Sequence, residues 1–154
     1  MPTPHDRRDS DWFTNRWLSD FNKVHDFRLS AIINGNYLEY LLNELLIQYF
    51  PDDHKKRTKE STFNKKMELL KDKEVFTTHV ILYNNIIILN EIRNHYAHTI
   101  GEDLDELPEK IKEKIRNLTF DFGPIGITEN DFKAKFQSSS MATIAHLLSI
   151  CNSF

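Results

Sequence analysis

The chain has 154 residues, of which 40% are hydrophobic and 28% charged, and its formal net charge is −3 at pH 7. This length suits one hydrophobic core, so we expect a single domain over residues 1–154 with the composition of a soluble globular protein. The acidic balance excludes a globally basic nucleic-acid binder. With only four glycines and five prolines, the chain also has few turn residues for an all-β fold.

Cysteine content and hydropathy indicate a cytoplasmic protein without a membrane segment. The lone Cys151 excludes an internal disulfide, fits a reducing compartment, and is interpreted as a small apolar packing residue. Residues 1–11 are polar and lack the apolar stretch of a signal peptide. The most apolar window, 80–89, is about half as long as the roughly 20 residues that a bilayer crossing needs.

The first half of the chain predicts two helices. Ser10 or Asp11 can cap the first, whose Trp12, Phe13 and Trp17 recur at helical spacing. We interpret these aromatic residues as core or dimer contacts, with base stacking as the alternative. Residues 27–50 form the longest helical pattern, which Pro51 ends. The glycine inside that pattern costs it only about 1 kcal/mol.

The second half predicts shorter helices after a loop. Ser61 or Thr62 can cap a short helix to residue 70, and a longer one begins at Val75 or Thr77 and reaches Tyr96. The β-branched run 86–88 favours a strand locally, but the helical spacing continues through a segment too long for one.

Pro108 predicts another helix start, with that helix reaching residue 117. Two further segments, 131–136 and 140–150, predict helices capped by Thr128 or Asn130 and by Ser140. The whole pattern predicts an all-α bundle of five to six helices.

Basic residues are concentrated between positions 54 and 73. This window holds eight of the twenty lysines and arginines against three acidic residues, a net charge of +5. Such a flank can guide a polyanion, although a solvated loop and helix face is the more common explanation. The weak candidates for nucleic-acid contact are Lys55, Lys56, Arg57, Lys59, Lys65 and Lys66.

The most informative segment is Glu-Ile-Arg-Asn-His-Tyr-Ala-His at 91–98. The guanidinium of Arg93 matches phosphate oxygens, and a histidine such as His98 exchanges protons near neutral pH. Residues four apart share a helix face, so Asn94 and His98 lie on one side, with Arg93 one step round the helix. We therefore expect Arg93, Asn94 and His98 to open onto one polar cleft, with His95 at its border.

The spacing of Arg93 and His98, with a polar residue directly after the arginine, resembles the HEPN superfamily of nucleotide-binding helical domains. Three wider stretches, STFNKKMELL at 61–70, EIRNHYAH at 91–98 and DELPEKIKEKIRNL at 105–118, resemble the mannitol operon repressor family within it. The resemblance covers residues 28–118.

This resemblance implies an α-helical homodimer in which the motifs of two subunits face each other. In active members the site is a metal-independent endoribonuclease that needs no cofactor. His98 would then be the general acid or base, Arg93 would hold the scissile phosphate, and Asn94 would orient either group. His95 is a possible accessory residue, and RNA and an antitoxin or other protein are possible partners.

The sequence also allows other functions for the motif. Many relatives bind or scaffold without cutting, so a non-catalytic transcriptional regulator or scaffold acting through protein contacts is the main alternative. A toxin of a toxin–antitoxin pair makes the same molecular prediction as the nuclease. Arg93 can also pair with Glu91, Glu102 or Asp103 in a purely structural role. A metal site built from Glu91, His95 and His98 is the least favoured, and we expect no metal.

Overall fold

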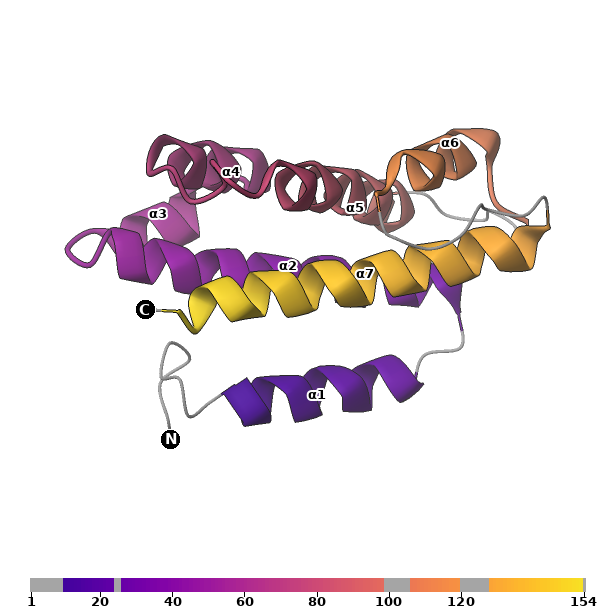
Figure 1. The fold of residues 1–154 in the computed structure, drawn as a ribbon, viewed down its shortest axis with the longest axis horizontal. Coiled ribbons are helices and arrows are strands. Elements are labelled where there is room, and N and C mark those ends of the chain that lie inside the picture. The colour runs from indigo at the N-terminus through magenta and orange to yellow at the C-terminus, as the bar shows by residue number, and fades with distance from the viewer. Residues whose placement is uncertain (1–9, 24–25, 99–105, 120–127, 154) are drawn as a thin grey trace.

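The computed structural model describes residues 10–23, 26–98, 106–119 and 128–153. This part of the chain forms seven α-helices and no strand, which confirms the predicted all-α fold with one or two helices more than expected (Figure 1). The helices are α1 (Ser10–Lys23), α2 (Phe27–Tyr49), α3 (His54–Glu60), α4 (Phe63–Asp72), α5 (Val80–His98), α6 (Glu109–Asn117) and α7 (Glu129–Cys151). None of the described helices is long and apolar enough to cross a membrane.

Helix α2 is the centre of the bundle. It packs against α1, α3, α4, α5 and α7, and five leucines in its second half are buried: Leu38, Leu41, Leu42, Leu45 and Leu46. Figure 1 shows α2 and α7 side by side, with α4, α5 and α6 in a row above them and α1 below. Because α2 has neighbours on several sides, its sequence is apolar over more than one face.

Side-chain caps fix where the helices start. Asp26 accepts a hydrogen bond from the backbone N–H of Arg28 at 2.8 Å and so begins α2. Thr62 begins α4 in the same way, by accepting from the N–H of Lys65. Thr128 and Asp131 form a capping box at the start of α7. Pro108 occupies the cap position before α6.

The structure differs from the predicted elements in three places. Residues 54–60, expected as a basic loop, form the short helix α3. Helix α7 runs unbroken through residues 137–140, because Ser139 and Ser140 are buried within it rather than capping a new helix. Helix α5 begins only at Val80, because residues 73–78 form turns after α4, whose end is marked by Glu74 in a left-handed conformation (φ 62°).

Candidate functional site

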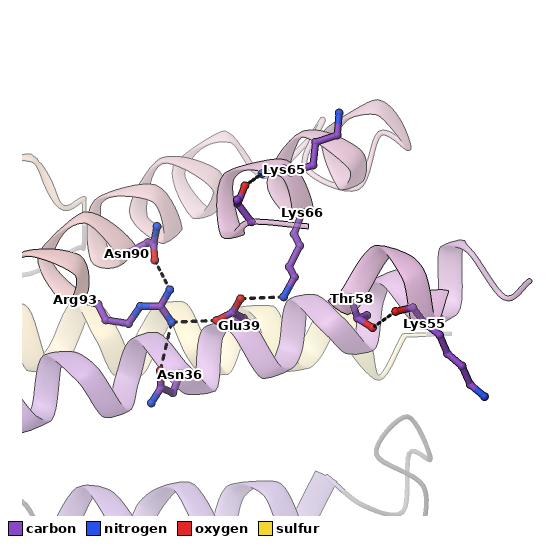
Figure 2. Close-up of polar contacts among 9 residues, drawn as sticks. Asn36, Glu39, Lys55, Thr58, Lys65, Lys66, Asn90 and Arg93 are labelled. Carbon is purple, nitrogen blue, oxygen red and sulfur yellow. Dashed lines mark hydrogen bonds and ion pairs between the residues drawn. The ribbon is translucent and has the colours of Figure 1, made fainter. Parts of the chain in front are cut away.

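The motif at 91–98 occupies the C-terminal turns of α5, where Arg93 points toward α2. Its Nη1 donates hydrogen bonds to Asn36 Oδ1 at 3.3 Å and to Glu39 Oε1 at 3.2 Å, both on α2. Its Nη2 donates to Asn90 Oδ1, one turn earlier on α5, at 2.6 Å. Figure 2 shows these contacts converging on one guanidinium. The Arg93 side chain is only 12% exposed, so the group lies within the bundle rather than in an open cleft.

Glu39 connects Arg93 to a second cation. Lys66, on α4, is nearly fully buried and donates from Nζ to Glu39 Oε2 at 2.8 Å, so one carboxylate joins α2, α4 and α5 (Figure 2). Burial opposes ionisation of Glu39, but Lys66 and then Arg93 outweigh it and hold the pKa of Glu39 below its usual value. The carboxylate therefore stays charged at neutral pH and pairs with both cations.

Gly35 makes room for the Arg93 side chain. A Cβ atom at this position would lie 2.8 Å from Arg93 Cγ and closer still to Cδ, distances that real side chains do not tolerate. The aliphatic part of Arg93 therefore crosses α2 directly over the glycine. The guanidinium carbon lies 5.1 Å from the centre of the Phe63 ring on α4, within range of a cation–π contact. Helices α2 and α4 together fix the arginine in one position.

The remaining polar residues of the motif face a different environment. Asn94 and His98, four residues apart on α5, are both exposed, while His95 is half-buried with its ring edge-on to Tyr96. Tyr96 is buried, and its carbonyl accepts a hydrogen bond from Arg28 Nε at 3.1 Å. The sequence thus correctly paired Asn94 with His98 on one face.

The expected cleft shared by Arg93 and His98 is not found within the chain. Arg93 contacts α2 and α4, His98 is exposed at the end of α5, and no hydrogen bond or ion pair joins the two in the part described. The physical reason is angular. Five residues of helix turn about 500°, which leaves side chains five apart about 140° from each other. One member of the pair therefore faces the bundle when the other faces solvent.

The ion pairs of Arg93 and Glu91 differ from those that the sequence suggested. Arg93 pairs with Glu39 rather than with Glu91, whose carboxylate instead accepts from Lys114 on α6. Glu102 and Asp103 lie outside the described residues. Within the described ranges, no group of three or more histidine, cysteine or acidic side chains is arranged to hold a metal ion.

The six weak candidates for nucleic-acid contact separate into three groups. Lys55, Lys56 and Lys59 on α3 and Lys65 on α4 are exposed. Arg57 pairs with Asp53 and lies 4.1 Å above the Phe50 ring, so its charge is partly used within the chain. Lys66 was wrongly assigned to this surface, because its ammonium is buried against Glu39.

Sequence reasoning missed four residues that make the Arg93 site: Gly35, Asn36, Glu39 and Asn90. Two signals could have found some of them. Asn90 precedes Arg93 by three residues, a spacing at which helical side chains meet. Glu39 is a charged residue within the predominantly apolar helix α2, where a carboxylate needs a cationic partner. Which cation it meets depends on how α2, α4 and α5 pack.

The burial of the N-terminal aromatic residues and of Cys151 can be compared with the packing roles predicted for them. Trp17 and Phe13 are buried as expected, whereas Trp12 is 44% exposed. Cys151 is buried, and burial followed by the charge of Glu44 raises the pKa of its thiol to about 12, which fits a packing role. His79 and His146 pack edge to face, with ring centres 4.9 Å apart.

No protein-family model matches the chain, and searches of curated proteins and of solved structures find no similar protein. The resemblance to the mannitol operon repressor family rests on the three stretches quoted above.

Proposed function

We propose that this chain is a non-catalytic helical binding module, similar to the mannitol operon repressor family, that acts as a regulator or scaffold through protein contacts. The observation that supports this proposal is the occupied guanidinium of Arg93. Three side-chain oxygens accept its hydrogen bonds, and the ring of Phe63 lies beside it. An arginine that binds a scissile phosphate must present its donors to the ligand, and three of the five N–H donors of Arg93 already bond to side chains of α2 and α5.

Releasing Arg93 toward a phosphate would carry a free-energy cost. Glu39 would lose one of its two cationic partners, and the oxygen of buried Asn90 would lose its donor. Leaving one such buried polar group unsatisfied costs about 1–3 kcal/mol, more where charge is involved. Arg93 is therefore assigned a structural role in this proposal, and the motif's resemblance to nuclease sites is one of sequence.

The contact surface that we propose lies where α5 starts beside α7. Val80 and Ile81, adjacent in the chain, are 61% and 58% exposed, and both line a hollow of about 520 Å³ to which Ala142 of α7 also contributes. Met141, next to that alanine, is another large exposed apolar residue. Two adjacent exposed apolar side chains beside a hollow favour protein contact. A second copy of the chain is the first partner to test.

Light scattering tests the proposed surface. The wild type is expected to form a dimer, and Ile81→Glu is expected to shift it to a monomer at the same concentration, because the carboxylate would be desolvated in the contact. Asn64→Glu, at an exposed position on α4, is the control and should leave the dimer intact. A monomeric wild type, or loss of the dimer in both variants, contradicts this surface.

A metal-independent endoribonuclease is the second candidate function. It is favoured by the exposure of Asn94 and His98 on one face of α5, where two subunits of a dimer can bring two such pairs together. In this case His98 would exchange the proton and Asn94 would orient the histidine. Arg93 would not be the phosphate ligand. A toxin of this kind would also arrest growth when expressed.

Incubation of the protein with labelled RNA in EDTA separates the two candidates. The binding module predicts no cleavage by the wild type and none by His98→Ala. Cleavage by the wild type that disappears in a correctly folded His98→Ala variant would overturn the non-catalytic assignment and support the nuclease. Circular dichroism spectra of both proteins establish that the fold is retained.

A further inference from the structure

A cavity of about 390 Å³ lies between α1 and α2, on a part of the molecule that the motif does not use. Four aromatic residues line it, Trp12 and Phe13 from α1 and Tyr37 and Tyr40 from α2. Its volume falls within the range of about 300–1,000 Å³ that is usual for small-molecule sites. Helix α1 packs on the bundle chiefly through α2, so the cavity is set by this one helix pair.

Three of the aromatic rings pack against one another, and the fourth is partly exposed to solvent. Phe13 is buried, stacks on Tyr40 with ring centres 5.7 Å apart, and meets Tyr37 edge-on at 5.4 Å. Trp12 lies 6.5 Å from Tyr40 but remains 44% exposed. The exposed indole of Trp12 therefore forms the solvent-open side of the cavity. The site therefore offers a flat apolar surface to a planar ring.

The polar residues of the cavity disfavour a cationic ligand. Among the lining residues that the structure describes, Asp20 is the one carboxylate, and its charge is already matched. It accepts a hydrogen bond from the hydroxyl of Tyr37, and Arg16 Nε lies 3.6 Å from its Oδ2. Arg16 itself is 63% exposed, so its guanidinium remains accessible to an incoming anion.

Charge beside the cavity also favours an anion. Asn36 lines the cavity and at the same time accepts the hydrogen bond from Arg93. The network behind Asn36 contains two cations, Arg93 and Lys66, against the single carboxylate of Glu39. The resulting excess of one positive charge attracts negative groups toward this side of the cavity.

We propose that the cavity between α1 and α2 binds a mononucleotide, with the base stacked on Trp12 and the phosphate drawn by Arg16. A planar ring with an attached anion is the ligand class that uses both features of the site, since stacking is tolerant of base identity and a guanidinium matches phosphate geometry. The site is separate from the apolar surface on α5 and α7, so this proposal and the proposed function can fail independently.

Calorimetric titration of the full chain with AMP, adenosine and inorganic phosphate tests the site. AMP is expected to bind with a measurable Kd, adenosine more weakly, and phosphate not detectably. Trp12→Ala should raise the Kd for AMP about tenfold or more, the size expected when one base–aromatic stack is lost. Trp12→Phe keeps a ring face and should retain most of the affinity.

Arg16→Gln separates the phosphate contact from the stacking contact. It should weaken AMP several-fold and leave adenosine unchanged, whereas Arg116→Gln, a matched change of an exposed arginine on α6, should alter neither. The proposal is overturned if no nucleotide binds at millimolar concentration, if Trp12→Ala binds AMP like the wild type, or if Arg16→Gln weakens both ligands equally. Circular dichroism of Trp12→Ala verifies that α1 remains helical.

Discussion

Arg93 and His98 belong to the same eight-residue motif and the same helix, yet their surroundings are opposite. Arg93 is 12% exposed and is held by α2 and α4, whereas His98 is exposed at the end of α5. The spacing of Arg93 and His98 in the sequence therefore does not by itself place them in one site. The neighbouring helices decide which residue becomes part of the bundle and which stays available to a partner.

The largest expected effect comes from removing the guanidinium. Arg93→Ala is expected to lower the free energy of unfolding by about 3 kcal/mol, because it breaks a largely buried ion pair and leaves the oxygens of Asn36 and Asn90 without a donor. Urea unfolding followed by circular dichroism measures the change. Arg116→Ala, which removes an exposed arginine paired with Glu109 and Glu113, serves as the control and should lower the free energy of unfolding far less, because exposed ion pairs are screened by solvent. Equal effects of the two variants would contradict the structural role of Arg93.

Gly35→Ala should have the next largest effect, with a magnitude that depends on Arg93. In the wild type the added Cβ overlaps the arginine side chain, and we expect a loss of about 2 kcal/mol from overpacking. In an Arg93→Ala background the overlaps with Cγ and Cδ disappear and only the contact with Cβ at 2.9 Å remains, so the same change should cost clearly less than in the wild type. Unfolding of all four proteins forms a double-mutant cycle. Additive effects would mean that the two side chains do not meet.

The pH dependence of stability provides a third test, through Glu39. Because its pKa is lower in the folded chain than in the unfolded one, its contribution is fully present above the unfolded value of about 4.3. The contribution is lost as the pH falls below that value and through the lower folded pKa. The stability difference between wild type and Glu39→Gln should therefore be largest near neutral pH and shrink in acid. A difference that stays constant from pH 7 to about pH 3 would contradict the pairing of Glu39 with Lys66 and Arg93.

The smallest effect is expected at the exposed end of the motif. His98→Ala should change the free energy of unfolding by no more than about 0.5 kcal/mol, as is usual for an exposed residue. Thermal unfolding monitored by circular dichroism is sufficient to detect a larger change. A loss comparable to that of Arg93→Ala would show that His98 also belongs to the packed network, and the contrast between the two residues would disappear.

Much of the fold could be predicted because it depends on local chemistry. The caps Thr128 and Thr62, the helix start at Pro108 and the break at Pro51 follow from rules that act within one turn of chain. The helical identity of residues 86–88 also followed from spacing, against the β-preference of three isoleucines. The break expected before Ser140 was wrong because burial in the bundle keeps that serine inside α7, an effect of distant residues.

The candidate site was less predictable. Sequence alone determined that α5 exists and that Asn94 and His98 share a face, because helix geometry relates residues a few positions apart. The packing of the helices, by contrast, determines that Arg93 crosses Gly35 and that Glu39 pairs with both Arg93 and Lys66, which lie 54 and 27 positions away from it. An ion pair between separate helices depends on how those helices pack, and no local rule specifies which buried carboxylate a given cation will meet.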